Sequence, residues 1–139
     1  MLATGHTTAE EHYAVVKEFA KRGPVVVTHA GDKLAGPRLT PVQCRELADL
    51  GAFVEITAQM CIEVLGHPGI APGEVLAMCR TIGPEHVCLS TDYGWGNLVP
   101  RPAQGMVEFL DGLWAEGVSE DELTTMVSKN PARVLSIDR

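Results

Sequence analysis

The amino-acid sequence predicts an α/β fold made of parallel β/α units. Short apolar runs alternate with helical patterns four times along the 139 residues, the order that produces right-handed crossovers and a parallel sheet. Three of the runs also lead into a histidine or an aspartate, as strands do when their carboxyl ends form a site. The four predicted strands cover residues 1–5, 24–28, 52–57 and 86–91.

The first strand leads into a helix with a well-defined start. Thr8 and Glu11 are spaced as a capping box, in which each side chain satisfies an exposed backbone amide. Apolar residues at helical spacing extend this helix to about Lys21, and the Arg22-Gly23-Pro24 stretch ends it. His12 is expected on the exposed side of the helix.

The second strand, Val25–Val27, is apolar at every position, as expected where both faces of a sheet are covered. A loop that contains several glycines, residues 30–39, follows it. Thr40 and Gln43 form the next capping box and predict a helix that ends at Gly51.

The second half of the chain repeats the pattern. The third strand precedes a long irregular stretch, about 58–72, of the kind that is usually functional or mobile in compact domains, and then a helix over about 73–81. The fourth strand precedes a helix over about 103–115, in which Trp114 is expected to be a core residue. Ser119–Glu122 is a third capping box and opens the last helix.

The strand ends carry the residues of greatest chemical interest. His6, His29 and Asp92 each follow an apolar run, and the carboxyl ends of parallel strands open onto one face. One histidine at a strand end is more often structural, but two imidazoles and a carboxylate in register predict a divalent-metal site with the ligand chemistry of zinc. Glu55, on the third strand, is expected to point inward, where it would hold a base, a metal or a histidine, or form a salt bridge.

The composition is that of a cytoplasmic globular protein. Hydrophobic residues make up 45% of the chain, and no apolar run approaches the roughly 20 residues of a membrane span. No signal peptide is visible. The net charge of −7, without a basic stripe, argues against a nucleic-acid partner. The four cysteines form no C-x-x-C pair and are expected to be buried small hydrophobes, with a reactive thiol at Cys61 as the alternative.

Several strand ends and the C-terminal stretch form a longer pattern: Thr4-Gly5-His6, Val27-Thr28-His29-Ala30, Leu89-Ser90-Thr91-Asp92-Tyr93-Gly94 and Asn130-Pro131-Ala132-Arg133-Val134-Leu135. In their order, these motifs resemble the second half of an amidohydrolase-superfamily enzyme. The resemblance implies a (β/α)8 barrel with one or two divalent metals at the carboxyl ends of its strands. His6, His29 and Asp92 would then take the ligand places on the fifth, sixth and eighth strands. Asn130 would cap a helix that follows the barrel, with Pro131 at its first position.

The sequence also departs from the family pattern. It lacks the His-x-His pair of the first barrel strand and the lysine or glutamate of the fourth, and the family architecture places both histidines on one metal and Asp92 on another. A complete barrel needs about 250 residues. Three explanations stay open: a piece of a longer protein, a half-barrel that pairs with itself, or a degenerate relative without activity.

A single half-barrel domain over residues 1–139, with C-terminal helices, would have two unpaired sheet edges and one uncovered face. Strands such as Val25–Val27 and Val87–Leu89 would expose apolar side chains on that face. We therefore expect either self-association or a missing N-terminal half as the partner.

Further residues are candidates for the walls of the site. Lys33 and Arg38, in the loop after the second strand, would bind a substrate carboxylate or phosphate, with solvated loop charges as the alternative. Tyr93, Trp95 and Asn97 follow the fourth strand and would wall a pocket for a small-molecule substrate.

The predicted function is that of a metal-dependent hydrolase, or a fragment of one, with zinc as the expected metal and manganese or iron as alternatives. Metal-activated water would attack an amide, ester, lactone or phosphoester. Asp92 would act as the general base, and His29 or His6 would hold metal or stabilise the oxyanion. The alternatives are a catalytically incomplete α/β module that associates through its open sheet, and a metal-dependent decarboxylase on the same scaffold. A flavodoxin-like domain is disfavoured because no glycine-rich phosphate loop follows the first strand.

Overall fold

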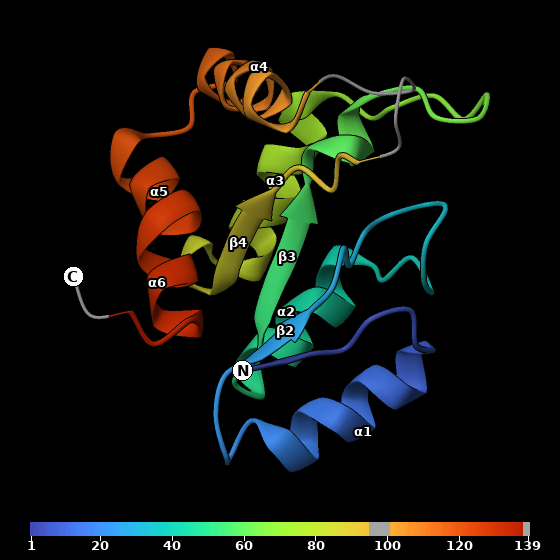
Figure 1. The fold of residues 1–139 in the computed structure, drawn as a ribbon, viewed down its shortest axis with the longest axis vertical. Helices are drawn as coiled ribbons and strands as arrows, with labels where there is room; N and C mark the ends of the chain where they lie inside the picture. The colour runs from blue at the N-terminus through green and yellow to red at the C-terminus, as the bar shows by residue number, and fades with distance from the viewer. Residues whose placement is uncertain (95–100, 138–139) are drawn as a thin grey trace.

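Four parallel strands form the centre of the protein (Figure 1). The computed structural model describes residues 1–94 and 101–137. The strands are hydrogen-bonded in chain order, β1-β2-β3-β4, and every neighbouring pair is parallel. Each strand lies within a predicted apolar run, so the predicted α/β architecture with a parallel sheet is confirmed. The strands are β1 Leu2–Ala3, β2 Val25–Val27, β3 Phe53–Thr57 and β4 Val87–Ser90.

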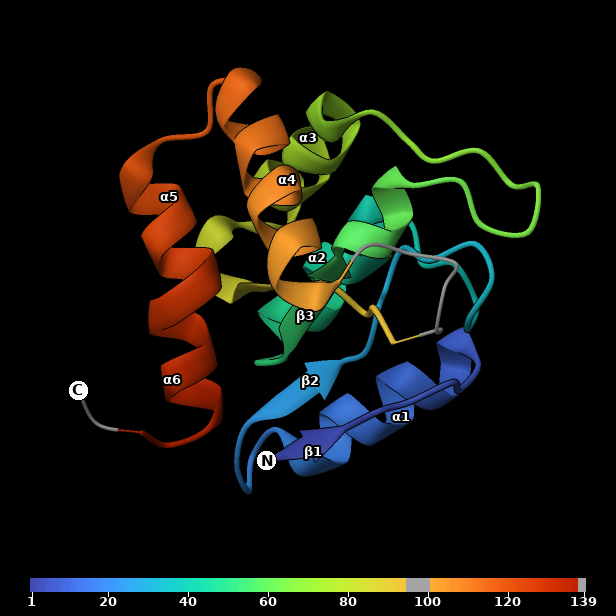
Figure 2. The same cartoon turned by 45° about the horizontal axis from the view of Figure 1, so that its top comes forward.

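Helices alternate with the strands, as the sequence predicts. The three predicted capping boxes are present at the starts of α1, α2 and α5, with the hydroxyl and the carboxylate or amide exchanging hydrogen bonds with backbone amides. Short 3₁₀ turns at Ala58–Cys61 and Pro84–His86 flank α3 on either side, and a π-helical turn, Thr125–Lys129, joins α5 to α6 as one rod beside β4 (Figures 1 and 2). The helices are α1 Ala9–Phe19, α2 Pro41–Asp49, α3 Pro72–Ile82, α4 Pro102–Ala115, α5 Glu120–Thr124 and α6 Asn130–Val134.

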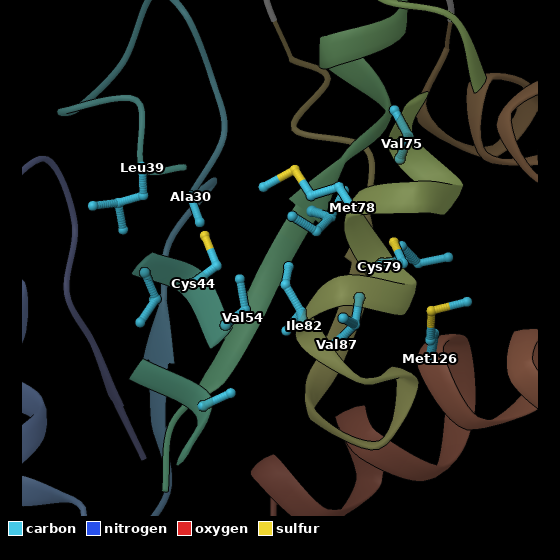
Figure 3. Packing of buried hydrophobic residues seen from close by; sticks show 14 of the residues in the cluster. Ala30, Leu39, Cys44, Val54, Val75, Met78, Cys79, Ile82, Val87 and Met126 are labelled. Atoms are coloured by element: carbon cyan, nitrogen blue, oxygen red, sulfur yellow. The ribbon is translucent and has the colours of Figure 1, made fainter. Parts of the chain in front are cut away.

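One face of the sheet carries the main hydrophobic core. Because side chains alternate along a strand, the β-branched and leucine residues of β2, β3 and β4 that face α1 to α4 all lie on this side. They pack with helix residues such as Cys44, Val75 and Ile82 (Figure 3). Most apolar side chains of β2 and β4 are therefore covered, contrary to expectation, and Val26 alone among those of β2 and β4 stays half-buried on the opposite face. The buried strand residues on this face are Val25, Val27, Val54, Ile56, Val87 and Leu89.

The opposite face of the sheet has a smaller cluster at its amino end. Phe53 and Cys88 pack there against Val134 of α6, and the guanidinium of Arg133 lies 5.2 Å from the centre of the Phe53 ring. Val26, the β2 residue on this face, stays half-buried. The C-terminal rod thus covers one end of the face that would line the interior of a barrel.

Asn130 does not cap a helix, which corrects the expectation from the terminal motif. It lies inside the continuous rod, and its side-chain amide is buried and donates to the carbonyl oxygens of Pro84, at 2.8 Å, and Val87, at 2.7 Å. Asn130 therefore ties the rod to the start of β4, because these two carbonyls have no strand partner on that side.

Two expectations about which side chains of the helices are exposed are also wrong. His12 is buried instead of exposed: its Nδ1 donates to the Thr8 carbonyl at 2.8 Å, and its Nε2 accepts from the Thr4 hydroxyl at 3.0 Å. Trp114 is 57% exposed instead of in the core. Helical spacing alone does not fix which side of a helix meets the sheet.

None of the helices in the described ranges combines the length and apolar character needed to cross a membrane.

Candidate metal-binding and catalytic site

Polar side chains gather at the carboxyl end of the sheet. Glu55 of β3 accepts a hydrogen bond from the backbone N–H of His29 at 3.0 Å and another from the Ser90 hydroxyl at 2.8 Å. Glu55 and Ser90 lie on the face opposite the main core, because they alternate with the buried residues of their strands. The expected inward orientation of Glu55 is present, and its carboxylate joins the ends of β2, β3 and β4.

The two histidines are neighbours. The ring centroids of His6 and His29 are 4.6 Å apart, with the ring planes tilted by 59°. His29 is 5% exposed, and among the described residues its buried Nε2 has no hydrogen-bond partner, whereas His6 is exposed. A buried nitrogen without a partner is costly, so this atom is available to a ligand. Gly5 has a φ of 65° and turns the chain from β1 into His6.

Asp92 lies beside this pair. Burial raises the pKa of its carboxyl group; the charges of Glu55 and Asp32 raise it further, and His29 and His6 act in the opposite direction. With the side-chain amide of Gln59 oriented so that its nitrogen faces Asp92, the assignment that satisfies both groups, it donates to Oδ2 and to the backbone oxygen of Asp92, each at 3.0 Å. Asp92 is therefore oriented by an amide and surrounded by charges of both signs.

Two of the three predicted ligands have a strained backbone. His29 has a φ of 32° and Asp92 a φ of 55°, the left-handed region that residues other than glycine rarely occupy. Aspartate tolerates this region better than histidine. Strain of this kind persists only where the surrounding structure enforces it, and it concentrates at functional sites. Both side chains are thereby turned away from the direction of an uninterrupted strand.

The arrangement places two imidazoles and a carboxylate at one end of the sheet. The structure brings His6, His29 and Asp92 to one end of the sheet, as predicted. Within residues 1–94 and 101–137, no group of three or more His, Cys, Asp or Glu side chains has the geometry to hold a metal ion. The imidazole pair supplies two nitrogen donors, of which Nε2 of His29 has no partner in the described part of the chain.

The predicted substrate-binding residues are divided between two places. Tyr93 lines a shallow strand-end pocket with Glu55, Ser90 and Asp92. Its ring packs so closely on α4 that a Cβ at Gly105 would lie 1.9 Å from the ring. Trp95 and Asn97 lie outside the described residues.

Lys33 and Arg38 line a different pocket, here called the side pocket, with a volume of about 470 Å³. It lies between the loop after β2 and the segment after β3, and its apolar wall includes Leu39, Met60 and Met78. The side pocket and the strand-end site share one neighbour, since Gln59 lines the former and hydrogen-bonds to Asp92.

Sequence reasoning missed three residues of this region: Ser90, Gln59 and Asp32. Ser90 could have been found from strand alternation, because it lies two residues after Cys88, the register partner of Glu55 on β4, and so on the same face as Glu55. Gln59 and Asp32 lie in irregular segments, and no periodic signal marks them. Asp32 is buried, and its Oδ1 accepts from the backbone N–H groups of Leu34 and Ala35.

The cysteines have no reactive role in this geometry. Burial raises the pKa of Cys61 to about 11, and burial raises the pKa values of Cys44, Cys79 and Cys88 to about 12. A thiol needs a lowered pKa to act as a nucleophile near neutral pH. The alternative of a reactive Cys61 is therefore disfavoured.

Comparison with known proteins adds a family match for the first part of the chain. Residues 1–55 match the model described as "Family of unknown function (DUF6282)". No curated protein matches the chain. The matched segment includes His6, His29 and Glu55 but ends before Asp92. Because the function of that family is unknown, the match assigns no activity.

Proposed function

We propose that the carboxyl end of the sheet is the centre of a metal-dependent hydrolase of the amidohydrolase type. The observation that carries the proposal is the imidazole pair: His6 and His29 have ring centroids 4.6 Å apart, and the buried Nε2 of His29 has no hydrogen-bond partner within residues 1–94 and 101–137. Two imidazole nitrogens and an aspartate carboxylate together form a donor set suited to zinc.

The fold supports a further step, that the chain corresponds to the C-terminal half of a (β/α)8 barrel. In a doubly wound sheet, helices cover both faces and the strand order reverses at a switch point. Here the strand order follows the chain, and residues of α1 to α4 share one core with the same face of the sheet. Sequential order with helices outside is the arrangement of a barrel wall.

The donors present fit a metal in part. His6 and His29 would hold one ion, and by the family resemblance Asp92 would belong to a second position. A zinc, manganese or iron ion bound there would lower the pKa of its water and polarise the substrate's carbonyl or phosphoryl group. The sequence has no His-x-His pair. The proposed centre would therefore take its additional metal ligands from a second copy of the chain or from another part of the protein.

The side chains of this chain have distinct roles in the proposal. Asp92 accepts the proton of the attacking water and passes it to the leaving group, and a raised carboxyl pKa makes it a stronger base once ionised. Gln59 fixes the orientation of that carboxylate through its amide. Glu55 positions His29 by accepting its backbone N–H.

The test begins with metal binding. Metal-free protein would be titrated with Zn²⁺ while the ring signals of the five histidines are followed by NMR. The signals of His6 and His29 are expected to change and those of His86, at the opposite end of β4, to stay constant. Unchanged signals of His6 and His29 at saturating Zn²⁺ would contradict the proposal.

Activity would then be measured with Zn²⁺, Mn²⁺ or Fe²⁺ against an amide, an ester, a lactone and a phosphoester. An aromatic carboxylic acid, monitored for CO₂ release, tests the decarboxylase alternative. Turnover of a hydrolytic substrate that requires both added metal and Asp92 is the expected result.

A catalytically incomplete module that associates through its open sheet is the second candidate. The observation that favours it is the inner face beside β1, where Ala3 is exposed and Val26 is half-buried. Association that is unaffected by metal, without turnover of any of these substrates, would support this candidate over the first.

A further inference from the structure

The side pocket has the character of a small-molecule site. Its volume of about 470 Å³ falls within the range of roughly 300–1,000 Å³ that such sites occupy. Most of its wall is apolar, and the apolar residues come from two loops and from α3: Leu34, Leu39, Met60, Ile62, Val64, Ile70 and Met78.

Two methionine methyl groups in the wall of the side pocket lie against Gly31, which also lines it. A Cβ at Gly31 would lie 2.7 Å from the methyl carbon of Met60 and 2.9 Å from that of Met78, so both side chains pack directly on the glycine backbone. In Figure 3 the Met78 side chain extends from α3 across the end of β3 toward Ala30 and Leu39. Methionine is unbranched and polarizable, so this part of the pocket wall can adapt to ligands of different shape.

Lys33 and Arg38 give the side pocket a cationic side. Both side chains are exposed, and within the described part of the chain neither lies within ion-pair distance of a carboxylate, whereas Arg22, Arg45 and Arg80 are each paired. Lys33 donates to the Pro68 carbonyl at 3.2 Å, which holds it between the two loops.

The acids of the side pocket do not compete for these cations. Asp32 is turned into its own loop, where two backbone N–H groups donate to it. Glu74 lies in the first turn of α3, where a carboxylate complements the positive end of the helix.

We propose that the side pocket binds a small organic anion, with its apolar body on Met60 and Met78 and its carboxylate against Lys33 and Arg38. Binding itself is independent of metal. A role for this pocket in substrate recognition rests on the hydrolase function proposed above. Gln59 connects the two sites, because it lines the side pocket and hydrogen-bonds to Asp92.

The test is a titration of metal-free protein carrying ¹³C-methyl methionine, with octanoate as the probe. The methyl signals of Met60 and Met78 are expected to shift together, and that of Met126, which is fully buried in the core outside the side pocket, to stay constant. From butyrate to octanoate, affinity should rise about fourfold for each methylene group buried. Octanamide, which has the same body without the charge, should bind more weakly.

A pair of charge variants tests the cationic side. Lys33→Gln with Arg38→Gln should weaken octanoate binding about three- to tenfold, as loss of two exposed ion pairs implies. Lys21→Gln with Lys129→Gln changes the net charge equally at exposed positions outside the side pocket and should leave affinity unchanged. Static Met60 and Met78 signals, equal binding of octanamide, or equal loss in both double variants would each overturn the inference.

The same titration separates this inference from the proposed function. Octanoate should bind Asp92→Asn as well as the parent protein, because Asp92 does not line the side pocket. Intact octanoate binding without any hydrolysis would remove the hydrolase proposal and leave the binding site. Hydrolysis without octanoate binding would do the reverse.

Discussion

The backbone N–H of His29 donates a hydrogen bond to the carboxylate of Glu55, with an N···Oε2 distance of 3.0 Å. This bond joins β2 to β3 where the chain enters a left-handed conformation at His29. Glu55 also accepts from Ser90 and contributes a negative charge near Asp92. One carboxylate thus holds the backbone of a predicted metal ligand and raises the pKa of the predicted base.

Glu55→Gln is expected to lower the pKa of Asp92 in the metal-free protein. Replacing the negative charge with a neutral amide removes a repulsion that opposes ionisation of Asp92, so this residue should lose its proton at lower pH. A ¹³C NMR titration of the side-chain carboxyl groups measures the shift. Glu74→Gln, in the first turn of α3, is the control and should leave the pKa of Asp92 unchanged. A higher or unaltered pKa in Glu55→Gln would contradict the prediction.

Asp92→Asn is expected to abolish hydrolysis while keeping the fold. General-base catalysis is worth roughly 100- to 10,000-fold, so the rate should fall at least that far. Asparagine also tolerates a φ of 55°, so circular dichroism should barely change. His86→Asn, at the amino end of β4, is the matched control and should keep the rate of the parent protein. A variant at Asp92 that retains its rate, or that unfolds, would remove this residue from the base role.

The same variant has a signed effect on the pH dependence of stability. The native pKa of Asp92 lies above the ordinary value of 3.8, so the folded state holds this proton more tightly than the unfolded state. The resulting stabilisation is present at lower pH and is lost as pH rises through the native pKa. Urea unfolding of the metal-free proteins at a series of pH values should therefore show the parent losing stability relative to Asp92→Asn across that window. A parent that gains relative stability there would show that the pKa is lowered.

Metal content after dialysis is expected to be well under one equivalent per chain. Three ligands can make a catalytic zinc site, but the family resemblance divides His6 and His29 from Asp92. Elemental analysis of protein dialysed against metal-free buffer measures the bound fraction. Tight stoichiometric zinc that is lost in His29→Ala and kept in His86→Ala would show that this division is wrong.

Self-association is expected for the purified protein. The apolar strand residues are covered by helices, so the driving surface is the edge at β1 and the half-covered inner face beside it. Sedimentation velocity over a range of concentrations should show a dimer or larger. Zinc should shift the equilibrium further toward the assembly if a second copy supplies ligands. A monomer at high concentration, with and without zinc, would count against a half-barrel that pairs with itself.

Asn130→Ala is expected to lower the free energy of unfolding by about 1–3 kcal/mol, because the buried Val87 carbonyl loses its donor, whereas the part-buried Pro84 carbonyl keeps the backbone N–H of Val87. Both carbonyl groups lie at or just before the start of β4. The loss of stability therefore also measures how firmly the C-terminal rod holds this strand. Ser128→Ala, at an exposed position two residues earlier, should stay within about 0.5 kcal/mol of the parent. Equal stability of the two variants in urea would contradict the role of Asn130.

The local features of the fold could be predicted because their causes are local. Thr8 and Glu11 satisfy each other's backbone amides over three residues, so the start of α1 can be predicted from this short segment alone. The run Val25–Val27 is β-branched at every position, which favours a strand, although only the face of Val25 and Val27 is fully covered. The convergence of His6 and His29 also followed from strand direction alone.

Features that depend on contacts between distant segments could not be predicted. The burial of His12 depends on Thr4 lying opposite it at the end of β1. The role of Asn130 depends on carbonyl groups more than forty residues earlier in the chain. The side pocket forms between two loops without periodic patterns, and loop conformation is not encoded in hydrophobic spacing.

The neighbour relations of the sheet set an order of assembly during synthesis. Every strand pairs with the strand made just before it, so the sheet can grow outward as the chain leaves the ribosome, without waiting for a distant segment. The two imidazoles come from the first two strand ends and can meet before the fourth strand is made. Asp92 arrives later, and the C-terminal rod closes over Phe53 and Cys88 last. In a nascent chain, the nitrogen donors would therefore be in place before the oxygen donor that is proposed to act beside them.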